Sequence, residues 1–194
     1  MDHIEGYCYH VYNRSIEGKI IFKSKDNYEF LLRKMGEYIA IYNLSMIAYC
    51  LMPNHYHMLI RVDTNNTLSP FIKRLFNSYT QAYNKQNHRK GTIFEGSAQV
   101  KLVESDEYVL LLSRYIHLNP VQAGLVDSPG EWQYSNYLEW IGDREGRLVS
   151  RDFINAYFNT PDEYRDFVES NIQNNLVKVS DLDKVVKKVG SIVS

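Results

Sequence analysis

The sequence predicts an α+β fold of the ferredoxin-like (split βαβ) class, a four-stranded antiparallel sheet with two helices on one face. Two observations carry this prediction. Apolar segments of strand type alternate with segments of helical spacing in the order β-α-β-β-α-β-α, and the first six match the split βαβ pattern. The composition, 44% hydrophobic and 13% aromatic over 194 residues, is typical of a chain that forms one domain with a real core.

The pattern opens with a strand over residues 6–14, which are rich in β-branched and aromatic side chains. A helix over 27–42 follows, for which Ser24 or Asp26 can serve as the N-cap. Its apolar residues recur at helical spacing: Tyr28, Leu31, Leu32, Met35, Tyr38, Ile39 and Tyr42. Residues 44–52 are again continuously apolar and predict the second strand.

The turn signal at Pro53-Asn54 separates that strand from a third over 55–62, so the pair is predicted to form a hairpin. The second helix is expected to begin with Ser69 as N-cap and Pro70 at the first helical position. A polar loop then leads to the fourth strand, over 97–104. These elements complete the four strands and two helices of the predicted fold.

The third helix lies outside the split βαβ pattern and is expected near the open face of the sheet. Ser105 can cap it, and Asp106 and Glu107 fall in the first turn, where the helix dipole favours negative charge. We expect it to end near Asn119, because Pro120 disfavours a helical conformation in the residue before it.

Beyond residue 142 the sequence becomes more polar and charged, which predicts a domain over 1–142 and a helical extension over 143–194. Within the extension, 161–173 is expected to be a helix that packs through Tyr164 and Phe167. We expect the extension to be an appendage outside the functional site, because its acidic balance would repel nucleic acid.

The net charge of −1 hides an uneven distribution: residues 1–104 carry 13 basic against 9 acidic side chains, and the rest carry 9 against 14. The stretch 64–94 holds five basic residues and no acidic one, which indicates either a solvated helix face or a phosphate-binding surface. No apolar run approaches the roughly 20 residues that span a bilayer, and the acidic N-terminus has no apolar signal region. We therefore expect a cytoplasmic protein with no membrane partner.

The third predicted strand contains two histidines, His55 and His57, inside the apolar run MPNHYHMLI. Strand alternation puts both on one face, together with Leu59 and Arg61, whereas the residues between them form an apolar face suited to packing under the helices. Two imidazoles at i and i+2 can both reach one divalent metal ion. The alternative is that both are hydrogen-bonded structural residues.

The third helix offers partners for such a metal site. Tyr115 and Asn119 are four residues apart and share a face, so a hydroxyl nucleophile and an amide-oxygen ligand could lie over the paired histidines. That arrangement would suit metal-assisted phosphoryl transfer. Alternatively, Tyr115 is a core residue and Asn119 a C-cap before Pro120. His117 points away from this face and is expected to be structural or exposed.

Several segments together resemble the single-tyrosine HUH transposases (U is apolar), and within them the REP-associated tyrosine transposases and their IS200-like relatives. The HUH motif matches His55-Tyr56-His57. The resemblance covers about three-quarters of the chain, and its other segments are Tyr9-His10-Val11 through Arg14, 48–54, Tyr79-Thr80-Gln81, Phe94-Glu95-Gly96, 113–126, Trp132 and Ser135-Asn136-Tyr137. Its most specific motif is the long run SRYIHLNPVQAGLV over 113–126.

The resemblance implies that Tyr115 is the nucleophile and that His55, His57 and Asn119 hold a divalent metal, Mg²⁺ or Mn²⁺. It implies a metal-dependent endonuclease and strand transferase acting on single-stranded or hairpin DNA through a covalent 5′-phosphotyrosine, and it leaves a homodimer open. Imidazole and amide ligands suit Mn²⁺ better than Mg²⁺, which remains plausible with waters. Relatives follow the glycine at Gly96 with Arg, an aromatic residue and Lys, so the Ser97-Ala98-Gln99 of this chain predicts two fewer phosphate contacts.

For contacts with DNA we consider the basic residues Arg14, Arg61, Lys73, Arg74, Lys85, Arg89, Lys90 and Lys101. Arg14 shares a face of the first strand with His10, and we expect Arg14 to contact phosphate and His10 to be structural or to support the metal ligands. Two alternatives remain. One is a non-catalytic nucleic-acid-binding module of RRM-like topology, which would display stacking aromatics on its open face. The other is a metal-dependent phosphodiesterase that uses water in place of Tyr115.

Overall fold

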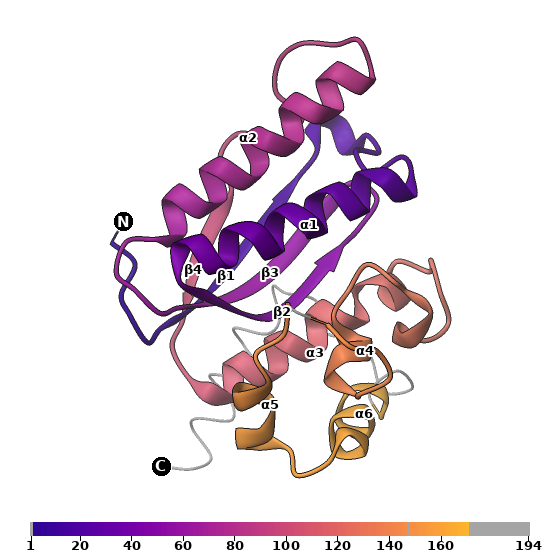
Figure 1. The fold of residues 1–194 in the computed structure, drawn as a ribbon. Helices are drawn as coiled ribbons and strands as arrows, with labels where there is room; N and C mark the ends of the chain where they lie inside the picture. The colour runs from indigo at the N-terminus through magenta and orange to yellow at the C-terminus, as the bar shows by residue number, and fades with distance from the viewer. Residues whose placement is uncertain (1, 147, 171–194) are drawn as a thin grey trace.

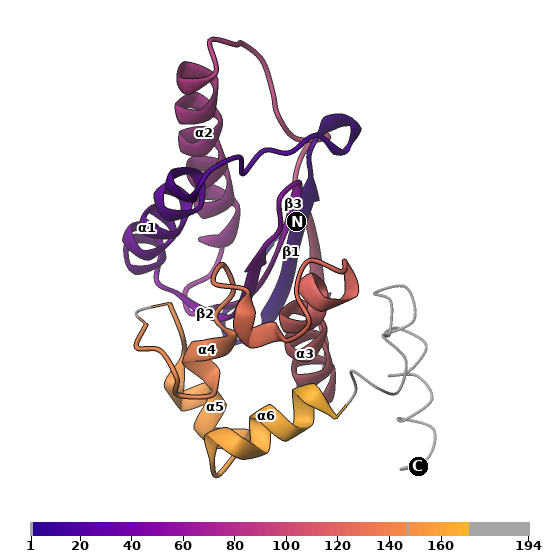
Figure 2. The same ribbon diagram turned by 90° about the vertical axis from the view of Figure 1, so that its right-hand side faces the viewer.

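The computed structural model describes residues 2–146 and 148–170, and every statement below concerns these residues. Its centre is a four-stranded antiparallel sheet in the order β2-β3-β1-β4, which confirms the predicted fold class (Figure 1). The strands are β1 (Cys8–Arg14), β2 (Leu44–Leu51), β3 (His55–Val62) and β4 (Gln99–Val103). Helices α1 (Lys25–Tyr42) and α2 (Leu68–Gln86) cover one face of the sheet, as Figure 2 shows edge-on.

The first core lies between the sheet and these two helices. It contains one alternating set of β3 side chains, Tyr56, Met58, Ile60 and Val62, each at most 1% exposed. The strand alternation read from the sequence is therefore confirmed, and His55, His57, Leu59 and Arg61 face the other way. Burying this apolar set fixes which face of β3 the histidines occupy, because successive side chains point to opposite faces.

The helix boundaries differ from prediction at the start of α2. The helix begins at Leu68 with Thr67 as the N-cap, so the expected cap at Ser69 is wrong by two residues. Pro70 lies inside the first turn and is accommodated there, because the first N–H groups of a helix have no intrahelical acceptor to lose. At the other helix, Ser24 is the N-cap of α1, and Asn43 ends it in the left-handed conformation with φ 48°.

Helix α3 (Asp106–Gln122) packs on the opposite face of the sheet, as expected. Ser105 caps it by accepting a hydrogen bond from the Tyr108 backbone N–H at 3.2 Å. The helix does not end near Asn119: Pro120 lies within it, and the last turn continues through an Ala123 N–H bond to the Asn119 carbonyl. Pro120 is buried in that turn, so packing outweighs the backbone preference of the residue before proline.

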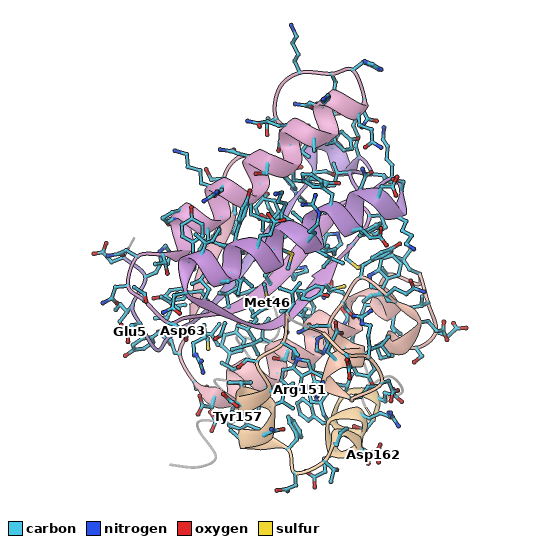
Figure 3. All side chains as sticks on the ribbon, in the orientation of Figure 1. Glu5, Met46, Asp63, Arg151, Tyr157 and Asp162 are labelled. Atoms are coloured by element: carbon cyan, nitrogen blue, oxygen red, sulfur yellow. The ribbon has the colours of Figure 1, made fainter. Side chains whose placement is uncertain are left out.

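The later helices α4 (Tyr137–Trp140), α5 (Arg151–Tyr157) and α6 (Pro161–Glu169) join a second core with α3, after a short 3₁₀ turn, η2 (Pro129–Glu131). In Figure 3, Arg151 marks the start of α5 close to Met46 of β2, and the Ser150 N–H donates to the Met46 carbonyl at 3.1 Å. The predicted packing through Tyr164 and Phe167 is confirmed, because both belong to the second core, so the extension is integral to that core up to Val168 and is not a loose appendage. The end of its predicted helix, residues 171–173, lies outside the described residues, and the boundary at 142 stays a prediction.

A buried network joins α3 to both the sheet and α6. His117 contacts the Tyr164 hydroxyl through Nδ1 at 2.7 Å and the side-chain Oδ1 of Asn136 through Nε2 at 2.9 Å. The Asn136 side chain also accepts from the Tyr49 N–H and donates to the Ile47 carbonyl, both at the outer edge of β2. His117 is fully buried, which confirms its structural role. Burial lowers its pKa to about 4, so it is neutral at pH 7.

No helix among the described residues is long and apolar enough to cross a membrane.

Replacing Tyr164 should show that the extension supports the fold. Tyr164 is fully buried, packs on Trp140 at 4.1 Å between ring centroids and bonds to His117. Tyr164→Ala should lower the free energy of unfolding by about 3–5 kcal/mol, because it opens a large cavity and leaves a buried imidazole nitrogen unpaired. Tyr7→Ala, at a residue that is 48% exposed, should change it by less than about 0.5 kcal/mol. Urea denaturation measures both, and equal effects would contradict the assignment.

Candidate active site

The two histidines of β3 lie side by side with their ring centroids 5.3 Å apart and their planes at 86°. Each uses Nδ1 in a hydrogen bond within the protein: His55 Nδ1 contacts Asn54 Oδ1 at 2.7 Å, and His57 Nδ1 contacts His10 Nε2 at 3.0 Å. The ring nitrogen outside these two bonds is Nε2 in both residues. The pair can therefore offer two Nε2 atoms to one ligand.

Both rings are neutral at pH 7. Burial lowers the pKa of His55, partly offset by a side-chain hydrogen bond with Asn119. Burial also holds the pKa of His57 well below its usual value, and the neighbouring His10 and His55 add to the effect. A neutral imidazole has a lone pair on one nitrogen, which is the form that binds metals.

Tyr115 and Asn119 lie next to this pair, because α3 packs on the face of the sheet that carries the histidines. The Tyr115 ring lies edge-on to the His57 ring, with centroids 5.5 Å apart. The Asn119 amide nitrogen donates to the Tyr115 backbone carbonyl at 2.9 Å. Asn119 is not the C-cap of α3, since Ala123 holds that position. The structure thus brings together all four residues predicted for the site.

The environment of Tyr115 sets its protonation state. The side chain is partly covered by the second core, and burial raises its pKa, while the hydrogen bond with Asn119 acts in the opposite direction. The hydroxyl is therefore neutral at pH 7. A tyrosine in this state is a weak nucleophile and must lose its proton during any attack.

A cavity of about 690 Å³ opens beside the histidines. Its walls come from β1, β3, β4 and the loops that adjoin them, and they include Tyr12, Arg14, Asn54, Glu95 and Gln99. The volume lies within the range of clefts that hold small ligands or part of a polymer. The cavity mixes charged and amide side chains, so it suits a polar ligand.

Two of the predicted DNA contacts lie near this cavity. Arg14 projects from the end of β1, opposite His55 in the strand register, with 73% of its side chain exposed, and it pairs with Glu95. Lys101 of β4 is paired with His10 in the register and has its Nζ 5.9 Å from the Tyr12 ring centroid. Both cations are therefore on the face of the sheet that carries the histidines.

The other predicted contacts lie elsewhere. Arg61 is six residues from His55 along β3, about 20 Å away, and pairs with Asp63, which Figure 3 labels. Lys73 and Arg74 belong to α2 on the far face, where Lys73 lines a separate cavity of about 470 Å³ and Arg74 stacks on Tyr38. Of the remaining three, Lys85 lies in the last turn of α2, and Arg89 and Lys90 follow the end of that helix.

Among the cavity residues that were not predicted as site residues, Asn54 and Glu95 contact residues that were. Asn54 adjoins the histidine pair in the sequence. Because it was read as a turn residue, its contact with His55 Nδ1 was not predicted. Glu95 is 81 residues from its partner Arg14, so only the folded chain shows that a carboxylate neutralises this cation. A lone carboxylate next to Gly96 has no sequence signal for that role.

Comparisons with known proteins found a family model, a curated protein and a solved structure that are similar to this chain. The family model described as "Transposase IS200 like" matches residues 3–119, a range that ends at Asn119 and includes His55, His57 and Tyr115. A curated protein of Haemophilus influenzae (strain ATCC 51907 / DSM 11121 / KW20 / Rd), whose name assigns it to the REP-associated tyrosine transposases, is 26% identical over 106 residues. That alignment covers 50% of this chain and 60% of the relative's length.

A solved structure, of a REP-associated tyrosine transposase bound to a REP hairpin, superimposes with a TM-score of 0.58. The match covers 78% of this chain and 89% of the other, at 13% sequence identity. At this identity the likeness concerns the fold.

Proposed function

The chain belongs to the IS200-like transposase family, and on that premise we propose that it is a metal-dependent endonuclease and strand transferase for single-stranded DNA. In this proposal Tyr115 forms a covalent 5′-phosphotyrosine intermediate. The observation that supports it best is the position of Tyr115, whose ring lies edge-on to His57 with centroids 5.5 Å apart, while His57 lies beside His55. This packing brings the candidate nucleophile next to the candidate metal ligands.

The donor set fits a divalent metal. His55 and His57 are neutral and have Nε2 outside their hydrogen bonds to Asn54 and His10. Among the described residues no group of three His, Cys, Asp or Glu could hold a metal, so a third protein ligand would be the Asn119 amide oxygen. Two imidazoles and an amide suit Mn²⁺, and Mg²⁺ with additional waters. A cation bound there would offset negative charge on the scissile phosphate.

The proposed reaction is an in-line displacement at phosphorus. The Tyr115 oxygen attacks the scissile phosphate, the bond from phosphorus to the 3′ oxygen breaks, and the phenolic proton is lost to solvent. The 3′ oxygen gains a proton and leaves as a hydroxyl, while the 5′ phosphate stays on Tyr115. One phosphoester bond replaces another, so a 3′-hydroxyl can later reverse the step and rejoin DNA without ATP.

For the substrate we propose single-stranded or hairpin DNA, because the solved relative is described as bound to a REP hairpin. Arg14 and Lys101 could bind phosphates at the cavity. The Glu95 carboxylate reduces the positive charge there, and Ser97-Ala98-Gln99 supply no cation. These features predict weaker phosphate binding than a cavity lined by additional basic residues would give.

A covalent adduct separates this proposal from a water-using phosphodiesterase and from a binding module. Tyr115→Phe removes only the hydroxyl, so labelled single-stranded DNA should still bind but should form no adduct on a denaturing gel. His57→Ala should abolish the adduct through loss of metal binding. Asn119→Ala should weaken Mn²⁺ binding less, because a water can replace one amide oxygen.

Tyr7→Phe, at an exposed tyrosine, is the matched control and should form the adduct normally. Adduct formation by Tyr115→Phe would exclude Tyr115 as the nucleophile.

The raised pKa of Tyr115 predicts a pH dependence. Well below that pKa, the phenolate fraction increases about tenfold for each pH unit. The two histidines are already neutral at pH 7, so their charge does not change above it. The single-turnover rate of adduct formation with saturating Mg²⁺ should therefore rise from pH 7 to 8.5. A rate that is constant or falls over this range would mean that loss of the tyrosine proton does not limit the step.

The ion pair of Arg14 with Glu95 yields two variants with opposite effects. Arg14→Ala should weaken binding of single-stranded DNA and reduce the slope of log K against log salt by about 0.7, the value for one phosphate contact. Glu95→Gln should strengthen binding, because it removes a negative charge and frees the guanidinium. Arg33→Ala breaks a similarly exposed pair with Glu37 on the far helix layer and should change neither quantity. An unchanged slope in Arg14→Ala would contradict the phosphate contact.

A further inference from the structure

A third histidine contacts one of the candidate metal ligands, His57. His10 of β1 is 2% exposed, and its Nε2 lies 3.0 Å from His57 Nδ1. The two rings stack with centroids 5.2 Å apart and planes at 22°. Tyr12 packs against both, with its ring centroid 4.7 Å from that of His10 and 5.8 Å from that of His57. Three packed rings hold the two imidazoles in one orientation, so the contact between their nitrogens is a fixed feature of the sheet.

One proton lies between these two nitrogens, and the nitrogen that carries it determines whether His57 Nε2 can bind a metal ion. If His10 donates, His57 Nδ1 is the acceptor and the single proton of the neutral His57 ring is on Nε2, where it blocks a metal. If His57 donates from Nδ1, the lone pair is on Nε2 and the ring can bind a cation. A neutral imidazole has one donor and one acceptor nitrogen, so the partner of Nδ1 selects the tautomer.

The neighbouring ligand shows the same selection with a different partner. His55 Nδ1 faces the amide oxygen of Asn54, which can only accept, so His55 must carry its proton on Nδ1. His57 faces a ring nitrogen in place of an oxygen. His10 Nε2 lies within hydrogen-bond distance of His57 Nδ1 and can accept from it, because an imidazole nitrogen without a proton is an acceptor.

We propose that His10 is a positioning residue for the metal site, accepting the Nδ1 proton of His57 and thereby holding the His57 Nε2 lone pair for the cation. This inference rests on the proposed function, because it assigns a role toward the metal of that site. Partners of metal-bound imidazoles are more often carboxylates or carbonyls. An imidazole in that position fixes the tautomer without adding negative charge, which leaves more of the cation's charge for the DNA phosphate.

The direct test is the tautomer of His57 in the full chain without metal, read from long-range ¹H–¹⁵N spectra of ¹⁵N-histidine protein at pH 7.5. The expected result is a proton on Nδ1 and none on Nε2. A proton on Nε2 of His57 in the wild-type protein would overturn the inference. This measurement needs no variant, so it decides the question even where a substitution at position 10 fails to fold.

Two variants extend the test to metal affinity. His10→Leu removes the acceptor and should weaken Mn²⁺ binding, measured by calorimetry on the full chain, about 10- to 100-fold. His10→Gln has an amide oxygen of similar reach and should bind within a few-fold of wild type. Metal-free thermal melting of each variant separates loss of the acceptor from general destabilisation. Equal Mn²⁺ affinity in wild type and a folded His10→Leu would refute the role of His10.

The same experiments distinguish this inference from the proposed function. A wild-type chain that binds Mn²⁺ with the expected His57 tautomer but forms no DNA adduct would contradict the proposed function and leave the role of His10 standing. A wild-type chain that forms the adduct with His57 protonated on Nε2 would overturn the inference alone. Absence of Mn²⁺ binding by the wild-type chain would overturn both.

Discussion

The antiparallel pairing of β1 with β3 is the constraint on which the candidate site depends. This register sets Arg14 opposite His55 and Tyr12 opposite His57, and it brings His10 diagonally next to His57. A slip of one residue would turn every side chain of one strand to the other face. The register is held by the apolar sets on the helix side, where burial of Tyr56, Met58, Ile60 and Val62 leaves the histidines no alternative face. Packing on one side of the sheet therefore dictates the chemistry on the other.

The second requirement is that α3 stays fixed against the sheet, since it carries Tyr115 and Asn119. Apolar contacts supply much of this, through Leu112 and Ile116 in the second core. Orientation comes from the network in which His117 joins Asn136, and Asn136 in turn bonds to the edge of β2. His117 also contacts Tyr164, so α6 is linked to the helix that carries the nucleophile. The described part of the extension thereby supports the candidate site, and none of its described residues lines the cavity beside the histidines.

Local sequence patterns predicted much of the fold and the centre of the site. Strand alternation placed His55 and His57 together, helical spacing placed Tyr115 with Asn119, and the Ser105 cap was correct. The errors came from tertiary effects. Packing carries α3 through Pro120, against the backbone preference of the residue before proline. The basic residues of α2 lie on the face away from the histidines, so their predicted contact with DNA stays a prediction, and the partner of Arg14 was missed because it is distant in sequence.

The most direct test of this account is to locate the nucleotide on the protein. The denatured adduct, trimmed by nuclease and digested with protease, can be sequenced by tandem mass spectrometry. The account predicts a single nucleotide monophosphate attached to Tyr115. A nucleotide on another tyrosine, or cleaved DNA with a 5′ phosphate and no modified peptide, would contradict it.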